Sequence, residues 1–283
     1  MRKGQGFMEV LALSLKEDYR FPVLEIFAFF YTIATIFFVN ANLSGMGTQF
    51  IKSEECLAFN LVEVLSGLPL VFILVLIVKN IAFGLGNDLE KGTMQTYLMY
   101  PLSRKSLLLA KLLSSVGVAL LLFLGIQIFV LSIVAPYTVL LHMSTVILTC
   151  MAALCYPLFV VGIVLLLTFF VKRGGWALII GIFMQFMSEM LVTLALYLSS
   201  AMNSNLIIKF FAVINPVIAL SQYYRSSPQH YMQASQEGLS GFAGGAIWSP
   251  SFSEALLYLG AGYILVAVIF IFVFYYFERR LEV

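Results

Sequence analysis

The sequence predicts an all-α integral membrane protein built as one helical bundle, and three observations lead to this fold class. Hydrophobic residues make up 61% of the chain and charged residues only 11%, whereas soluble domains average about 45–50% apolar and about 25% charged residues. The cations are spread unevenly over the connections between apolar segments. Six segments are apolar and close to the length of about 20 residues that a bilayer crossing needs: 23–39, 63–81, 107–134, 146–171, 176–198 and 255–277.

The distribution of cations orients this bundle. Six crossings return both termini to the same side of the membrane. With the N-terminus in the cytoplasm, all of the 16 Lys and Arg residues lie on the cytoplasmic side except Lys52, Lys209 and Arg225. This excess agrees with the positive-inside rule. We therefore expect residues 1–283 to form one multi-pass domain in the cell membrane, with both termini cytoplasmic and the lipid bilayer as its surroundings.

The N-terminal residues are expected to form a helix on the membrane surface. A cleaved signal peptide is not expected, because Glu9 and then Lys16, Glu17 and Asp18 interrupt the apolar stretch. Apolar residues recur at i, i+3, i+4 and i+8 from Phe7, which is typical of an amphipathic interfacial helix. A plain cytosolic lead-in is the alternative.

The apolar segment 205–224 tests the count of six spans. Lys209 and the pair Asn215-Pro216 divide it into two short pieces, so we expect re-entrant or interfacial helices within a long outer connection, 199–253. A seventh span is the alternative, and it would move the C-terminus to the outside.

Residues 87–111 form an unusually polar cytoplasmic connection between the second and third spans. Asn87 or Asp88 is expected to cap a short helix, Gly92 to interrupt it, and Thr93 to cap the next turn. The short amphipathic helix that follows has an apolar face made of Met94, Tyr97 and Leu98.

The third transmembrane helix is expected to begin inside this connection. Pro101 turns the chain, and Ser103 is placed to cap the helix. At 1.5 Å per residue the segment 107–134 would be about 42 Å long, which exceeds the roughly 30 Å of hydrocarbon. We therefore expect its first turns to protrude into the cytoplasm. Arg104 and Lys105 are expected at headgroup level and Lys111 a turn and a half further in.

The segment DLEKGTMQTYLMYPLSRKSLLLAKLL resembles the cytoplasmic signature of the type-2 ABC exporter permeases. The shared pattern is an acidic residue, Gly-Thr, a short leucine-containing helix, Pro, Ser-Arg and a leucine run that ends in Lys. It falls on Glu90, Gly92, Thr93, Leu98, Pro101, Ser103, Arg104 and Lys111. The wider layout is also similar, with an elbow helix, six spans and broken helices between the fifth and sixth. Ala110 stands where the family commonly has Gly.

The resemblance implies a transport subunit whose short cytoplasmic helix docks in a groove of a separate ATPase. Two ATPase subunits and a second permease, identical or different, are the implied partners, and export is the implied direction. A solvated loop with ordinary helix caps is the alternative for this segment. The residues implied in coupling are Asp88, Glu90, Gly92, Thr93, Met94, Tyr97, Leu98, Pro101 and Arg104.

The chain itself is not expected to be an enzyme or to bind a cofactor or nucleic acid. No Gly-x-x-x-x-Gly-Lys-Ser/Thr motif occurs in the sequence, so ATP and Mg²⁺ are expected on the partner ATPase. The Gly-Leu-Ser-Gly at Ser240 matches the motif of rhomboid proteases, but the two histidines, His142 and His230, both precede it. An intramembrane protease is therefore disfavoured. No metal site is expected, because the two His and the three Cys residues have no zinc-like spacing.

The fifth span carries a polar stripe at four-residue spacing. A carboxylate at the bilayer centre is costly unless it is protonated, paired or facing water, and Glu189 lies well inside this span. The resemblance implies that the fifth span lies at the contact between two permease subunits, beside the translocation route. We therefore expect the stripe to line that route or, equally, to form a buried seam between helices. An ion-coupled carrier or channel that uses Glu189 is the alternative function. The stripe consists of Gln185, Glu189, Thr193 and Tyr197.

Overall fold

The protein is described by a computed structural model that covers residues 3–19, 23–44, 51–93, 103–202, 204–231 and 248–279. Within these ranges the secondary structure is helical, and the only β feature is an isolated bridge between Ile51 and Tyr231. The predicted all-α class is confirmed. The helices, with the π-helical segments labelled η, are α1 Lys3–Asp18, α2 Val23–Leu43, α3 Glu54–Leu65, α4 Leu68–Asn80, η2 Ile81–Gly86, α5 Asn87–Glu90, α7 Arg104–Leu112, η3 Leu113–Gly117, α8 Val118–Val134, α9 Pro136–Leu141, α10 Met143–Val171, α11 Gly174–Ala201, α12 Leu206–Ile214, α13 Val217–Ser226 and α14 Phe252–Arg279.

Several helical runs are long and apolar enough to cross a membrane, which supports the prediction of a membrane-embedded protein. Among the described residues there are five such runs: Leu24–Leu43, Pro69–Glu90, Arg104–Val134, Met143–Val171 and Phe252–Arg279. The expected fifth span corresponds to α11, which is 28 residues long and whose apolar part among the described residues is Gly174–Met184. The count of six spans stays a prediction.

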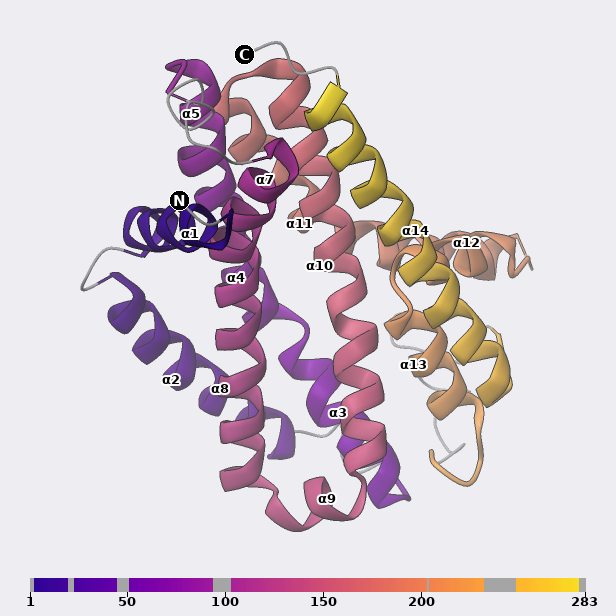
Figure 1. The fold of residues 1–283 in the computed structure, drawn as a ribbon. Coiled ribbons are helices and arrows are strands. Elements are labelled where there is room, and N and C mark those ends of the chain that lie inside the picture. Colours follow the sequence, from indigo (N-terminus) through magenta and orange to yellow (C-terminus); the bar gives the residue numbers. More distant parts are fainter. Residues whose placement is uncertain are drawn as a thin grey trace.

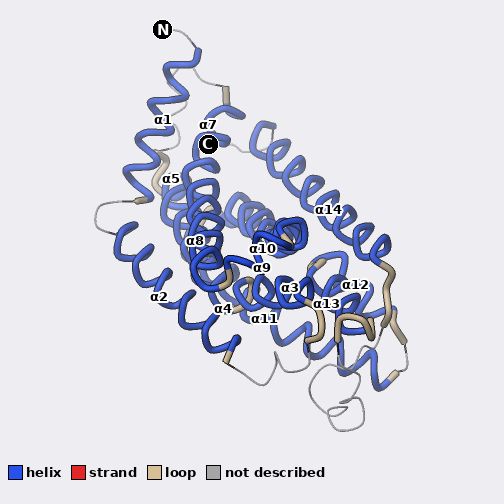
Figure 2. Tube along the Cα trace, turned by 90° about the horizontal axis from the view of Figure 1, so that it is seen from below, coloured by secondary structure: helices blue, strands red, loops and turns tan. Residues whose placement is uncertain are grey.

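The long helices run roughly side by side, and α1 lies across them (Figure 1). The elements α5 and α7, the start of α1 and the end of α14 gather at one end of the bundle, whereas α9 lies at the other end. Viewed along the bundle, α2 and α14 lie on opposite flanks, with α8 and α10 between them (Figure 2). The two ends of the chain that the structure describes therefore lie at the same end of the bundle.

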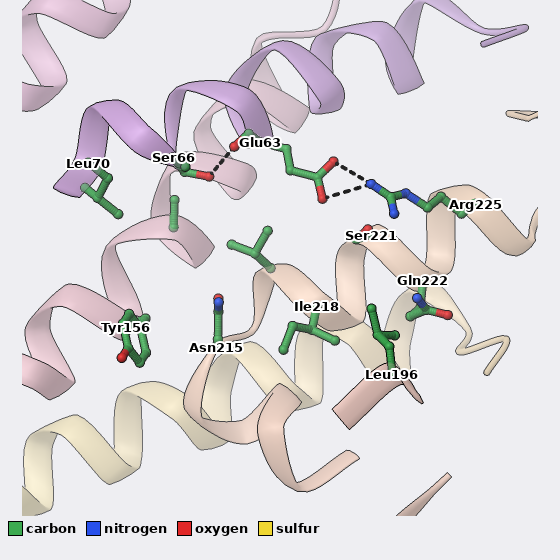
Figure 3. A pocket seen from close by; sticks show the side chains of 13 residues that line it. Glu63, Ser66, Leu70, Tyr156, Leu196, Asn215, Ile218, Ser221, Gln222 and Arg225 are labelled. Carbon is green, nitrogen blue, oxygen red and sulfur yellow. Dashed lines mark hydrogen bonds and ion pairs between the residues drawn. The ribbon is translucent and has the colours of Figure 1, made fainter. Parts of the chain in front are cut away.

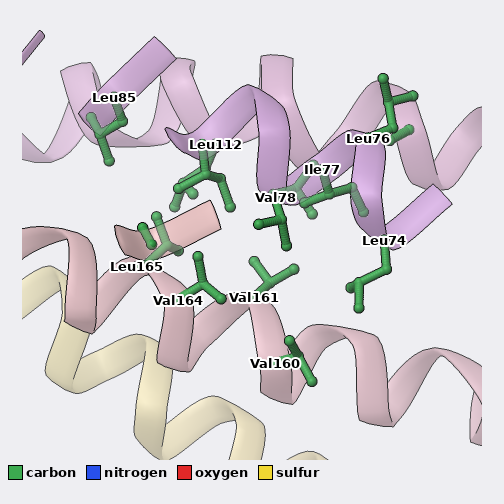
Figure 4. Close-up of a cluster of buried hydrophobic side chains, with 14 of the residues drawn as sticks. Leu74, Leu76, Ile77, Val78, Leu85, Leu112, Val160, Val161, Val164 and Leu165 are labelled. Carbon is green, nitrogen blue, oxygen red and sulfur yellow. The ribbon is translucent and has the colours of Figure 1, made fainter. Parts of the chain in front are cut away.

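The core is an apolar cluster between α4, α7 and α10 (Figure 4). Ile77 of α4 and Val161 and Val164 of α10 are completely buried. The aliphatic side chains of the cluster meet because α10 packs against α4 and η2 on one side and α14 on the other. In water, burying such side chains stabilises a fold by about 25 cal/mol per Å² of apolar surface. Inside a bilayer, close van der Waals packing between helices takes the place of this driving force.

The second span differs from the prediction at both ends. A break at Ser66 and Gly67, followed by Pro69, separates α3 from α4, because proline has no N–H to donate to the preceding turn. The helix then continues through η2 and α5 to Glu90, well past the expected end at residue 81. The expected helix cap at Asn87 or Asp88 is wrong, since the residue before α5, Gly86, is itself helical and no side chain caps this helix.

Other local predictions are confirmed. Ser103 caps α7, because its Oγ accepts a hydrogen bond from the Ser106 backbone N–H at 3.2 Å. The segment 205–224 forms two short helices, α12 and α13, with the break at Asn215 and Pro216. The N-terminal segment is the helix α1. Where α1, α12 and α13 lie relative to a bilayer stays a prediction.

Candidate functional site

Five of the predicted coupling residues lie in the described part of the chain, close to one end of the bundle. They are Asp88, Glu90, Gly92, Thr93 and Arg104. The helix predicted to follow Thr93 lies outside the described residues, together with Met94, Tyr97, Leu98 and Pro101.

The chain leaves α5 through a left-handed turn. Gly92 has φ of +71°, a conformation that glycine adopts without the steric cost of a Cβ atom. Thr93 then folds back on the helix, because its Oγ1 donates to Asp88 Oδ1 at 2.8 Å and to the Asp88 carbonyl at 3.3 Å. The predicted interruption at Gly92 is confirmed, and Thr93 acts on the helix before it. Whether it also caps the next turn lies outside the described residues.

Lys111 ties this turn to two other helices. Its Nζ lies 2.8 Å from Asp88 Oδ2 of α5 and 3.2 Å from Glu17 Oε2 of α1, and its side chain is only 5% exposed. A lysine so deeply buried needs a partner to offset the loss of hydration. Through this cation, ion pairs join α7 to both α5 and α1.

Asp18, at the end of α1, extends the same polar cluster. Ser114 Oγ of η3 donates a hydrogen bond to Asp18 Oδ2, and Lys79 Nζ of α4 donates to the Asp18 backbone carbonyl at 3.3 Å. Burial raises the pKa of the Asp18 carboxyl to about 6, and the hydrogen bond from Ser114 and the charges of Lys111 and Lys79 act in the opposite direction. We name the set Glu17, Asp18, Lys79, Asp88, Lys111 and Ser114 the elbow cluster.

A cavity of about 310 Å³ lies between α1 and the end of the second helical run. Asp18, Lys79, Asn87 and Asp88 line it, together with Lys91. Glu90 and Lys91 are exposed, so the outer face of this turn carries charge at its surface, whereas its inner face is held by the elbow cluster.

Arg104 lies apart from this turn and contacts the last helix. Its Nη1 donates to the Glu278 carbonyl at 3.3 Å, and the neighbouring Lys105 forms an ion pair of 3.0 Å with the Glu278 carboxylate. The start of α7 is therefore joined to the end of α14. The structure brings Asp88 and Thr93 together but places Arg104 in a different contact.

The elbow cluster is not evident from the sequence. The sequence places Lys79 at a span end where its amine would reach water, but the helical run continues past it to Glu90 and Asp18 folds over it. The sequence feature that could have indicated the cluster is a set of charged residues beside or within apolar stretches, namely Asp18, Lys79 and Lys111. Only the folded chain shows that the three meet.

The predicted polar stripe lies on α11, which is helical as expected. The side chains of Gln185 and Glu189 are outside the described residues. Thr193 is exposed, and Tyr197 is 69% exposed. They do not lie in a buried seam within the described part of one chain.

A second cavity, of about 200 Å³, is not expected from the sequence (Figure 3). It lies where both helix breaks, Ser66-Gly67 and Asn215-Pro216, come together beside α10 and α11. Glu63 and Arg225 form an ion pair in its wall, with Arg225 Nη2 at 3.4 Å from both carboxylate oxygens. The sequence places Arg225 in an outer loop, and its pairing with a residue 162 positions away has no signature there.

The residues considered for other chemistries lie apart. His142 Nε2 is 3.8 Å from Glu54, and His230 Nδ1 shares a hydrogen bond of 2.7 Å with Ser53 Oγ, while Ser240 is outside the described residues. Within the described ranges no three His, Cys, Asp or Glu residues are grouped as metal ligands.

No family model matches this chain, and no curated protein matches it. The resemblance of residues 87–111 to the type-2 ABC exporter permeases therefore rests on the residues of that segment.

Proposed function

We propose that this membrane-embedded chain is the permease subunit of an ATP-driven ABC transporter, working with two separate ATPase subunits and a second permease. The observation that supports this most directly is the three-way contact of Lys111 with Asp88 and Glu17. A transport subunit has to receive the motion of its ATPase at one end and pass it to its spanning helices. The elbow cluster is a physical link of that kind.

The link starts at the turn that the resemblance assigns to ATPase docking. Asp88 belongs to the helical run that begins at Leu68, so a force on the turn acts along the whole second span. Lys111 transfers the same force to the base of the third span and to α1. The pair Lys111–Asp88 is the more buried part of this link, and leaving a buried charge without its partner costs about 3–5 kcal/mol, which favours movement of the two helices as one unit.

The exposed side of the turn supplies the contact with the ATPase. Glu90 and Lys91 are exposed and carry opposite charges, which is the arrangement that orients a helix in a groove. ATP and Mg²⁺ bind to the ATPase subunits. Closure of the two ATPase subunits on each other drives alternating access of the permease pair. Export is the direction that the resemblance favours, and both termini of the permease face the ATPase.

The test is co-purification of the tagged chain from its own membranes in a mild detergent, with partners identified by mass spectrometry. We expect a soluble subunit with a P-loop to co-purify with the wild type. The double variant Glu90→Arg with Arg104→Glu should lose that subunit or its coupled ATP hydrolysis. Glu54→Lys is the matched control, because it reverses one exposed carboxylate at the other end of the bundle and should retain the partner.

Absence of any nucleotide-binding chain, under conditions that keep the protein folded, would contradict the proposal. Loss of the partner in Glu54→Lys as well would mean that the effect is a general failure of folding.

A further inference from the structure

The cavity between the two helix breaks has the features of a binding site. Helix breaks leave backbone groups without intrahelical partners, and here the breaks at Ser66-Gly67 and Asn215-Pro216 line one space. In membrane proteins, broken backbone is tolerated where it is buried in protein or lines a cavity. Two breaks from distant parts of the chain thus share one polar pocket.

The ion pair in its wall is loose. Arg225 Nη2 is shared between both oxygens of Glu63 at 3.4 Å, whereas charge-assisted N–H···O hydrogen bonds are about 2.7–2.9 Å long. The other guanidinium N–H groups of Arg225 make no hydrogen bond to the described residues. Each partner therefore retains capacity for a stronger bond to a ligand of the opposite charge.

Neutral polar groups and an apolar wall complete the cavity. The side chains of Asn215 and Ser221 have no hydrogen-bond partner among the described residues. Figure 3 shows Ser221 beside the ion pair and Asn215 further along the same cavity, toward Tyr156. Leu70, Ala153 and Ile218 line the remaining surface. The wall thus offers one anion, one cation, free hydrogen-bonding groups and a hydrophobic side.

We propose that this cavity binds a zwitterionic group, with an ammonium facing Glu63 and a phosphate or carboxylate facing Arg225. A ligand with only one charge would form a strong bond with either Glu63 or Arg225 and would offer the other residue no better partner than it has now. A zwitterion replaces that contact with two charge-assisted hydrogen bonds, each roughly twice as strong as a neutral one. The volume of about 200 Å³ suits a lipid headgroup or an amino acid, since one water needs about 10–15 Å³ of the same space.

The proposal concerns binding by this chain alone and does not depend on an ATPase partner. The test uses the purified full chain in mild detergent and native mass spectrometry with short-chain phosphatidylethanolamine. Phosphatidylglycerol lacks the ammonium, while O-phosphorylethanolamine and glycine lack the acyl chains. We expect one saturable site for phosphatidylethanolamine and at least about tenfold weaker binding of phosphatidylglycerol, as for a lost charged hydrogen bond.

The soluble probes separate the two sources of the zwitterion. Binding of phosphatidylethanolamine without the soluble probes identifies a lipid headgroup, and binding of either soluble zwitterion identifies a small solute. Both results support the site. Equal binding of phosphatidylglycerol and phosphatidylethanolamine, or no binding of any probe, would overturn it.

Three variants connect the binding to this cavity. Arg225→Gln should weaken binding about tenfold or more, and Ala153→Leu should block it by filling the space while keeping the ion pair. Lys209→Gln is the matched control, because it removes a neighbouring ion pair, Lys209–Glu254 at 3.6 Å, outside the cavity, and should bind normally. If Ala153→Leu has the melting temperature of the wild type and still binds the zwitterionic probe, the site lies elsewhere.

Discussion

At the level of single residues, the polar groups of this chain are placed by their partners. Counted over the whole residue, Lys111 is 4% and Asp18 7% exposed, and both would be costly if unpaired. Each finds a partner on a different helix: Lys111 meets Asp88 and Glu17, and Asp18 meets Ser114. A few buried polar contacts therefore determine how α1, α5 and α7 are joined.

The raised pKa of Asp18 predicts how stability depends on pH. The carboxyl has a pKa of about 6 in the folded protein, against 3.8 ordinarily, so between these values the folded state holds more protons than the unfolded state. The free energy of unfolding therefore falls as pH rises through this window, by at most about 3 kcal/mol. Asp18→Asn should remove this fall and be the more stable form at pH 8, as measured by unfolding in detergent from pH 4 to pH 8.

Ser114→Ala provides the control for this prediction. It removes a hydrogen bond that lowers the pKa of Asp18, so it should steepen the loss of stability with pH. Parallel pH curves for the wild type and Asp18→Asn would show that Asp18 is not the titrating group.

Among the helices, the irregular segments are positioned by close contacts between backbones. The π-helical segment η2 packs against the start of α11, where a Cβ on Gly86 would lie 2.6 Å from Gly174 Cα. On the other side of this contact, a Cβ on Gly174 would overlap the carbonyl oxygen of Ala82. Small residues let two membrane helices approach in this way, and here they hold η2 against the start of α11.

Gly174→Ala is expected to destabilise the protein by about 1–3 kcal/mol, because the added methyl group meets backbone that has no rotamer to change. Gly175→Ala is the matched control, since a Cβ atom at that position would meet no other atom within 4 Å. Thermal unfolding of both variants in detergent measures the difference. Equal melting temperatures would show that α11 and η2 separate easily at this contact.

Across the whole molecule, the arrangement of the bundle predicts which connections share a side of the membrane. Figure 1 places α9 opposite α5 and the end of α14. The connection of Lys172 and Arg173 lies between α10 and α11, and one long helix, α10, separates it from α9. The six-span prediction assigns α9 to the outside and Arg173 to the cytoplasm.

Cysteine labelling in intact cells tests this topology. Tyr137→Cys, at an 82% exposed position of α9, should react with a membrane-impermeant thiol reagent. Arg173→Cys and Arg279→Cys should react only after permeabilisation. The natural cysteines, Cys56, Cys150 and Cys155, are buried and serve as the unlabelled background. Labelling of Arg279→Cys from outside would establish the seven-span alternative.

The order of amino acids is enough to predict the membrane class, the all-α fold and most helix positions. Apolar run length and local signals such as Ser103, Gly92 and Asn215-Pro216 act over a few residues, so they can be recognised without the folded chain. The contacts of Lys111 with Asp88 and Glu17, the pairing of Glu63 with Arg225 and the shared cavity of two helix breaks emerge only in three dimensions. The paired residues are up to 162 positions apart, and their meeting depends on how the helices pack, which no local pattern specifies.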